Sequence, residues 1–166
     1  MTFVDLRGIS GTCVAFLSLL ATSGFAESGT NELIQRGRYL AEEVAMCQEC
    51  HTPREASGAL ALDQWMKGGP VFFQPATMVS DWADRVPAIA GLPGWTDADF
   101  LYFLENGRRS TGEVPKPPMK RYNLSHQDAV AILAYLRSLA SPSGENEHRR
   151  RDAVLPLPRE VPSSAP

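Results

Sequence analysis

The feature that most constrains this chain of 166 residues is the pentapeptide Cys47-Gln48-Glu49-Cys50-His51. Two cysteines separated by two residues and followed directly by a histidine form the pattern through which a c-type haem is attached. When such a segment leaves a helix, both thiols reach one edge of a porphyrin and form thioethers with its vinyl groups, and the next imidazole reaches the iron. The pattern therefore predicts one haem c, bound covalently through Cys47 and Cys50, with His51 as the proximal iron ligand.

Two other kinds of site use similar residues. A CxxC pair alone can exchange thiols and disulfides, but the intervening Gln48 and Glu49 and the lack of a thioredoxin-like strand pattern before them give that reading little support. A structural zinc site needs about four Cys or His ligands, and the chain contains no second pair of cysteines. Both alternatives predict a protein without a Soret band.

The N-terminal residues 1–26 have the features of a cleavable signal peptide. Arg7 stands near the start, residues 13–21 are mostly apolar, and residues 24–26 offer the small side chains that a signal peptidase reads. The apolar run is too short to span a bilayer comfortably. We expect an exported, periplasmic protein with no stable membrane span after signal removal; a tether formed by an uncleaved N-terminal segment is the alternative. Cleavage would remove Cys13 and leave only the two cysteines of the motif.

Charge and composition limit the partners of the remaining chain. The sequence has 16 Lys and Arg against 19 Asp and Glu, a net charge of −3, which gives no reason to expect binding to nucleic acid. Residues 141–166 are rich in proline, carry three consecutive arginines from Arg149, and contain no aromatic residue. Such a segment has little to bury, so we expect a disordered tail after a domain that covers residues 27–140.

Within that domain, three segments have the pattern of helices. Residues 31–45 repeat apolar side chains at helical spacing up to the CxxCH motif. Residues 53–95 are rich in Gly and Pro, which predicts loops with at most a short helix near residues 60–66. Two further helices are expected at residues 96–107 and 125–139. Each of these begins with a capping pair, Thr96 with Asp99 and Ser125 with Asp128.

Taken together, residues 31–140 resemble a monohaem class I cytochrome c, and look most like the small electron-accepting cytochrome subunits of periplasmic dehydrogenases. The resemblance is carried, besides CQECH, by the stretches Arg36-Gly37-Arg38-Tyr39-Leu40-Ala41, Gly94-Trp95-Thr96-Asp97-Ala98-Asp99, Pro117-Pro118-Met119, Tyr122-Asn123-Leu124-Ser125 and Ala134-Tyr135-Leu136-Arg137-Ser138-Leu139.

The resemblance implies an all-α fold in which three to five helices wrap around one covalently bound haem. In this family the first and last helices pack through a glycine and an aromatic residue, which here would be Gly37 and Tyr135. The implied function is electron transfer, with single electrons accepted from a periplasmic dehydrogenase and passed to a respiratory acceptor. Such a protein catalyses no bond-making chemistry, although it can be the cytochrome subunit of an oxidoreductase complex.

The resemblance also implies that Met119 is the sixth ligand of the iron. This residue stands in a proline-rich loop just before the last helix, and a thioether ligand raises the reduction potential of the iron. Met66, Met78 and His126 remain as alternative ligands. If no side chain holds the sixth position, the same haem would suit a gas sensor or a peroxidase.

Other contacts of the haem are less defined by the sequence. The second ring nitrogen of His51 needs a partner that orients the imidazole, and the family suggests a backbone carbonyl in the loop after Pro53. Arg54 and Trp95 are candidates for hydrogen bonds to the haem propionates.

The expected partners are redox proteins. Residues 107–121, which carry the predicted ligand Met119, contain five basic residues against the single acidic residue Glu113. We expect the five to form a basic rim beside the haem edge that binds an acidic patch on a partner. The basic rim consists of Arg108, Arg109, Lys116, Lys120 and Arg121.

Overall fold

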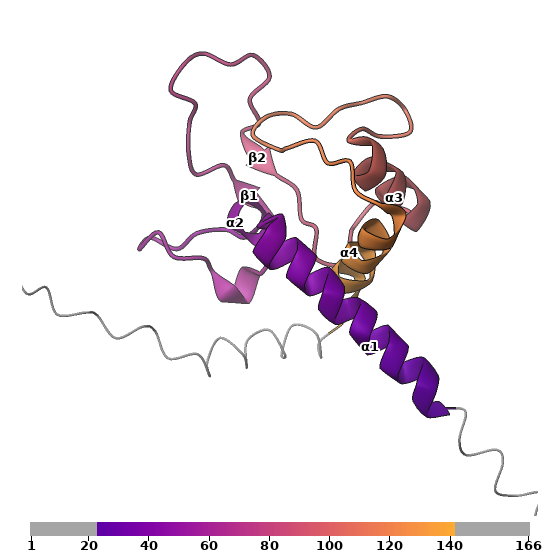
Figure 1. Ribbon diagram of the computed structural model, residues 1–166. Coiled ribbons are helices and arrows are strands. Elements are labelled where there is room, and N and C mark those ends of the chain that lie inside the picture. Colours follow the sequence, from indigo (N-terminus) through magenta and orange to yellow (C-terminus); the bar gives the residue numbers. More distant parts are fainter. Residues whose placement is uncertain (1–22, 142–166) are drawn as a thin grey trace, which may run out of the picture. The chain divides into compact units, whose positions relative to one another are not determined.

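The computed structural model describes residues 23–141, and the secondary structure of this part of the chain is mainly helical (Figure 1). Two compact units are distinguished, Met1–Glu32 and Leu33–Pro166. In chain order the elements are α1 (Ser23–Tyr39), a π-helical turn η1 (Leu40–Val44), α2 (Cys47–His51), a 3₁₀ turn η2 (Leu62–Gln64), β1 (Gly69–Pro70), β2 (Arg85–Val86), α3 (Asp97–Asn106) and α4 (His126–Ser138).

The first of these helices starts earlier than the sequence pattern predicts. Helix α1 begins at Ser23 rather than near residue 31, so its first part lies in the unit Met1–Glu32. The expected signal peptide, apart from residues 23–26, and the expected tail, apart from residue 141, lie outside the described residues.

The starts of α3 and α4 agree with the predicted caps. The Thr96 hydroxyl accepts a hydrogen bond from the Asp99 backbone N–H at 3.1 Å, and the Ser125 hydroxyl accepts one from the Asp128 N–H at 3.2 Å. These bonds satisfy backbone donors that have no partner inside a helix. Helix α3 ends at Gly107, whose φ of 63° is the left-handed conformation that glycine adopts without strain.

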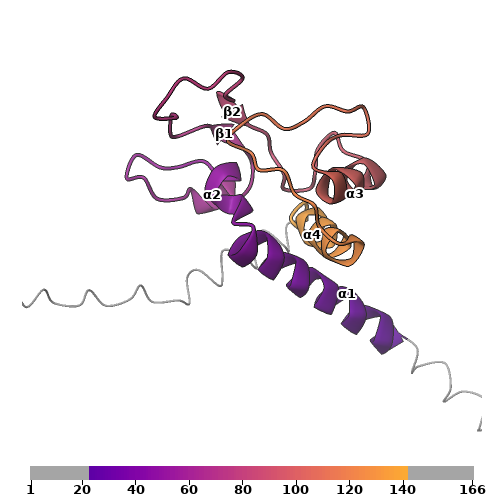
Figure 2. The same cartoon turned by 45° about the horizontal axis from the view of Figure 1, so that its top comes forward.

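Helix α4 crosses the part of α1 that follows Leu33, and the two backbones approach closely at Gly37 (Figure 2). A Cβ atom built on Gly37 would lie 1.8 Å from the Ala131 carbonyl oxygen and 2.9 Å from the Tyr135 Cβ. Arg36 and Asp128 form an ion pair at 2.5 Å beside this crossing. The prediction that Gly37 and Tyr135 pack together is confirmed.

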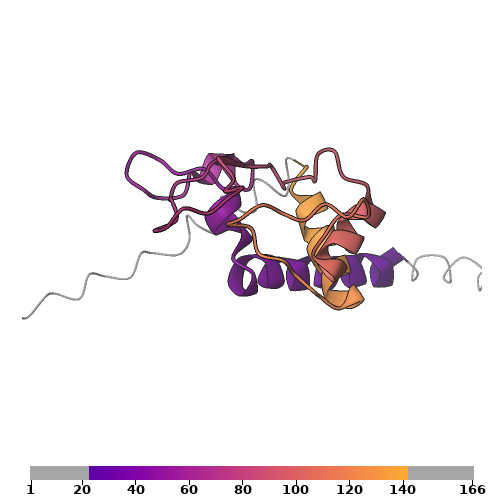
Figure 3. The same cartoon turned by 90° about the horizontal axis from the view of Figure 1, so that it is seen from above.

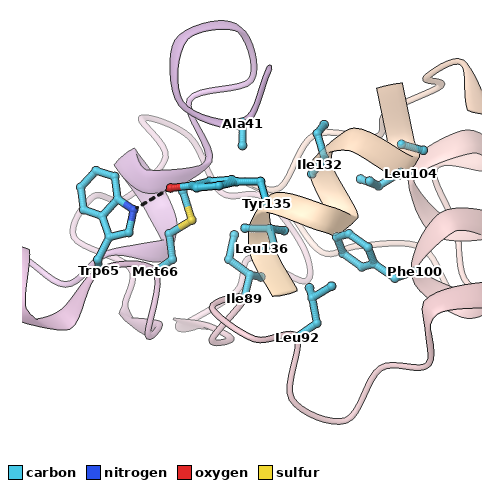
Figure 4. Packing of buried hydrophobic residues seen from close by; sticks show 11 residues of the cluster. Ala41, Trp65, Met66, Ile89, Leu92, Phe100, Leu104, Ile132, Tyr135 and Leu136 are labelled. Atoms are coloured by element: carbon cyan, nitrogen blue, oxygen red, sulfur yellow. Dashed lines mark hydrogen bonds between the residues drawn. The ribbon is translucent and has the colours of Figure 1, made fainter. Parts of the chain in front are cut away.

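Helices α3 and α4 lie side by side (Figure 3). A hydrophobic core packs between them and the loop that precedes α3 (Figure 4). Its largest fully buried apolar side chains are Met66, Leu92 and Leu136. The guanidinium of Arg137 closes this loop onto α4 by donating hydrogen bonds to backbone carbonyls and to a carboxylate. Its acceptors are the carbonyls of Gly91 at 2.6 Å, Leu92 at 3.2 Å and Trp95 at 2.8 Å, and the Asp97 carboxylate at 2.7 Å.

The Gly- and Pro-rich region of residues 53–95 contains little regular structure, as its composition predicts. The short helix expected near residues 60–66 is only the 3₁₀ turn Leu62–Gln64. Strands β1 and β2 form a two-residue antiparallel pair, with Gly69 opposite Val86 and Pro70 opposite Arg85. Within residues 23–141, no helix is long and apolar enough to cross a membrane.

Replacing Gly37 with Ala is expected to destabilise the fold by about 1–3 kcal/mol, because the added methyl group overlaps the Ala131 carbonyl and forces α1 and α4 apart. Chemical denaturation of the purified protein measures this change. Gly29→Ala is the matched control, since nothing lies within 4 Å of the position that its Cβ would take, and the helix preference of alanine should stabilise it by about 0.5–1 kcal/mol. Equal stability of the two variants would contradict the close approach at Gly37.

Candidate functional site

The CxxCH segment forms the one-turn helix α2, which is held in place at both of its ends. Met46 precedes it in the left-handed conformation with φ of 52°, so α2 turns away from η1 instead of extending it. At the other end, the Gly68 N–H donates to the His51 carbonyl at 2.8 Å. The Thr52 hydroxyl accepts from the Met66 N–H at 3.0 Å. The motif is thereby fixed to a segment whose Met66 lies in the core.

His51 is buried, with 5% of its surface exposed, and its ring has one backbone partner. Its Nδ1 lies 2.8 Å from the carbonyl oxygen of Pro87. Because a carbonyl only accepts hydrogen bonds, Nδ1 carries the proton, and in the neutral ring Nε2 keeps its lone pair. Burial lowers the pKa of His51, and the hydrogen bond to Pro87 opposes that effect. The neutral imidazole with a free Nε2 is the form that binds a metal.

The contact with Pro87 identifies the hydrogen-bond partner of the His51 ring, which the sequence alone did not assign. The expected partner of His51 was a backbone carbonyl in the loop after Pro53, and Pro87 provides it. No sequence signal singled out this residue, because every residue carries a carbonyl and the contact depends on how the loop folds.

The thiols of Cys47 and Cys50 are free and do not have the environment of reactive thiolates. Burial is the main cause that raises the pKa of Cys47 to about 11, and burial likewise raises the pKa of Cys50. Cysteines that exchange disulfides rapidly have a lowered pKa instead. Within residues 23–141, no group of three or more His, Cys, Asp or Glu side chains is arranged to hold a metal ion. The geometry thus gives no support to a dithiol or zinc site, whereas thioether formation suits two neighbouring thiols.

The loop that carries Met119 is brought beside the motif from the far end of the domain. After α3 it runs back toward β2 before it enters α4 (Figure 1), and the Ala83 N–H donates to the Pro117 carbonyl at 2.8 Å. The Tyr122 hydroxyl donates to the Ala45 carbonyl at 3.3 Å, two residues before Cys47. The charge of Lys120 is one of those that act on the Cys50 thiol. The residues that follow Met119 therefore lie next to the CxxCH segment, and Pro117 before it is attached to Ala83.

The other candidates for the sixth ligand have different surroundings. Met66 is fully buried in the core (Figure 4), and Met78 is fully exposed. His126 lies exposed at the start of α4 and pairs with the Glu105 carboxylate at 2.7 Å. These placements favour the half-buried Met119 over the three alternatives.

The two candidates for propionate binding already have protein partners. The Arg54 guanidinium donates to the Glu49 carboxylate at 2.7 Å and stacks 4.0 Å from the centre of the Phe72 ring. Trp95 packs against Phe100 and Phe103 and is covered by the Arg109 guanidinium at 3.8 Å. These contacts give Arg54 and Trp95 packing roles, and contact with a propionate remains a prediction for both.

Comparison with known proteins gives several similar cytochrome subunits. The chain is 31% identical to the fructose dehydrogenase cytochrome subunit of Gluconobacter japonicus over 119 residues, which is 66% of this chain and 22% of that protein. It is 29% identical to the cytochrome c subunit of the quinone alcohol dehydrogenase of Gluconobacter oxydans, over 75% of this chain and 28% of that subunit. It is 30% identical to a c-type dihaem cytochrome of Cereibacter sphaeroides, over 62% of this chain and 34% of that protein.

The matches thus span between about a fifth and a third of the length of these relatives. Residues 34–140 also match the family model described as cytochrome c, which accounts for more than half of the chain. The helical fold agrees with this match. The chain therefore belongs to the cytochrome c family, the electron-transport proteins that carry covalently bound haem c.

Proposed function

We propose that this chain is an exported carrier of single electrons with one haem c, attached through Cys47 and Cys50 and ligated by His51 and Met119. The observation that carries the proposal is the ring of His51, whose Nδ1 is bonded to the Pro87 carbonyl beside the two free thiols. Bound haem supplies an iron that alternates between Fe(III) and Fe(II). We propose one haem because the sequence contains a single CxxCH motif.

His51 contributes more than a ligand atom. Its hydrogen bond to Pro87 fixes the plane of the imidazole and makes Nε2 a better electron donor to a metal. The ring is buried, so water has little access to it. A fixed ligand changes little between the two oxidation states, which suits rapid electron transfer.

Met119 would complete the coordination from the loop that Pro117 and Tyr122 attach to the rest of the domain. A thioether favours Fe(II), and therefore raises the reduction potential, while it blocks the position at which a peroxidase or a gas sensor binds its ligand.

The source and destination of the electrons are proposed from the relatives. Two of the similar proteins are named as cytochrome subunits of a fructose dehydrogenase and of a quinone alcohol dehydrogenase. We infer that this chain likewise accepts electrons from a periplasmic dehydrogenase and passes them to a respiratory acceptor. Residues 1–26 would serve as the export signal.

The basic rim has two kinds of members. Arg109 stacks on Trp95, and Arg121 donates to the Gly107 carbonyl at 3.1 Å, so these two side chains also hold the loop in place. Arg108, Lys116, Lys120 and Arg121 are exposed, and Arg109 is half-buried. Arg108, Lys116 and Lys120 are the exposed members that we expect to attract an acidic partner surface.

The test of haem attachment is a denaturing gel stained for haem. The wild-type chain should keep its haem after denaturation, because thioether bonds survive the loss of the fold. Cys47→Ala and Cys50→Ala should each lose one thioether, and the double variant should lose the haem stain completely. A wild-type chain that releases its haem under these conditions would refute the proposed function.

Replacing Met119 with Ala should lower the reduction potential and open the iron to added ligands such as CO, because the sulfur that favours Fe(II) is lost. Visible spectra with and without CO, and a redox titration, measure both effects. Met66→Leu and His126→Gln are the controls, and their low-spin spectra should match that of the wild type. A wild-type protein that binds CO readily would favour the sensor or peroxidase instead.

The rim is tested by the salt dependence of electron transfer. Raising the ionic strength from about 0.01 M to about 0.15 M shortens the screening length from roughly 30 Å to roughly 8 Å. The bimolecular rate with the dehydrogenase should therefore fall, and Lys116→Glu with Lys120→Glu should slow it about tenfold or more at low salt. Lys67→Glu, outside the loop, should have a small effect. A rate that is independent of salt in the wild type would contradict docking through this rim.

A further inference from the structure

A buried hydrogen-bond chain connects the last helix to the turn that precedes the CxxCH motif. Tyr135 on α4 is 3% exposed, and its hydroxyl accepts a hydrogen bond from the Trp65 indole N–H at 3.3 Å (Figure 4). The same hydroxyl donates to the carboxylate of Glu42, which is half-buried. A Tyr hydroxyl that accepts one bond and donates another has a fixed orientation. The Glu42 carboxylate is thereby held against α4.

The local backbone explains why Glu42 points in this direction. Residues 40–44 form a π-helical turn, in which the Ala45 N–H donates to the Leu40 carbonyl at 2.8 Å. Such turns accommodate one extra residue in a helix and often occur at functional sites. The Gln48 side-chain amide also donates to the Glu42 carbonyl at 3.0 Å. The next residue, Glu43, is exposed, so two adjacent carboxylates have different environments.

Glu42 lies beside the attachment site, since the Gln48 side chain of the CxxCH motif donates to its backbone carbonyl. Burial comes first among the causes that raise the pKa of the Cys47 thiol, and the charges of Cys50 and Glu42 raise it further. A thioether has no proton to lose, but the field that acts on the sulfur also acts on the haem edge bonded to it. Arg38 is the basic residue whose charge acts on the same network, through Tyr135. A charge in a partly buried site is screened less than one in water.

We propose that Glu42, positioned by the hydroxyl of Tyr135, sets the reduction potential by placing a fixed negative charge beside the haem edge at Cys47. The inference rests on the proposed haem attachment. When the iron gains one electron, the haem loses one positive charge, so a nearby carboxylate stabilises the oxidised form more than the reduced form. Glu42 therefore lowers the potential, against the effect of the methionine ligand. Tyr135 is a positioning residue, because it acts through Glu42.

The experiment compares the midpoint potentials of the haem-loaded Glu42→Gln and Glu43→Gln variants with that of the wild type. Glutamine keeps the shape and can accept the bond from Tyr135, so Glu42→Gln removes the charge and keeps this hydrogen bond. We expect an upward shift in Glu42→Gln that is larger than that in Glu43→Gln and that persists at high ionic strength, where the effect of an exposed charge is screened. Equal shifts of the midpoint potential in the two variants, or no shift in Glu42→Gln, would overturn the role of Glu42.

Tyr135→Phe provides a second test, since it keeps the ring that packs against Gly37 and removes only the hydroxyl. The carboxylate then loses the hydrogen bond that fixes its position against α4, so the midpoint potential should shift upward, as in Glu42→Gln, but by less. An unchanged potential in this variant would overturn the role of Tyr135. Haem-stained gels of every variant separate these outcomes from a failure of the proposed function, in which the wild type itself would carry no covalent haem.

Discussion

The hydrogen bond between the His51 Nδ1 and the Pro87 carbonyl is the contact on which the site depends most. It fixes the tautomer and the plane of the ring, and it does so from a segment that begins four residues earlier with Ala83, whose N–H binds the Pro117 carbonyl. The short stretch of residues 83–87 thus contacts both the proximal histidine and the loop of Met119. Its pairing with β1, through Val86 and Arg85, stiffens it between the two contacts. A displacement of this stretch would disturb both predicted ligands together.

Hydrogen bonds to the core residue Met66 hold the backbone that directly follows residues 83–87. The Ile89 and Ala90 N–H groups both donate to the Met66 carbonyl, at 2.9 and 3.0 Å, and the Met66 N–H donates to Thr52, directly after His51. Met66 is itself fully buried. A methionine that the sequence offered as an alternative ligand therefore serves as a structural link between the motif and the loop. Its flexible apolar side chain suits such a packing role.

Local signals in the sequence predicted local structure well. They did not predict which distant segments come into contact. The starts of α3 and α4 were predictable because a capping hydroxyl and its backbone donor lie three residues apart. A glycine inside a helix indicates the close approach of another helix, but the partner of Gly37, Tyr135 on α4, was predictable only through the family resemblance. The Pro87 carbonyl and the three backbone carbonyls that accept from Arg137 have no sequence signature, because backbone groups are the same at every residue. The roles of Cys47, Cys50, His51 and Met119 remain predictions that the geometry supports.

The π-helical turn lies between two fixed points of one segment. Gly37 must face α4, since no side chain fits there, and ten residues later Cys47 begins the motif helix. Met46, in the left-handed conformation, ends the helical path before the motif, so α2 takes a new direction. The widened turn Leu40–Val44 lies between these points, and from it the Glu42 carboxylate reaches Tyr135. Each residue of a helix turns the direction of the side chain by about 100°. A residue inserted or deleted between Gly37 and Glu42 would therefore turn the carboxylate away from Tyr135.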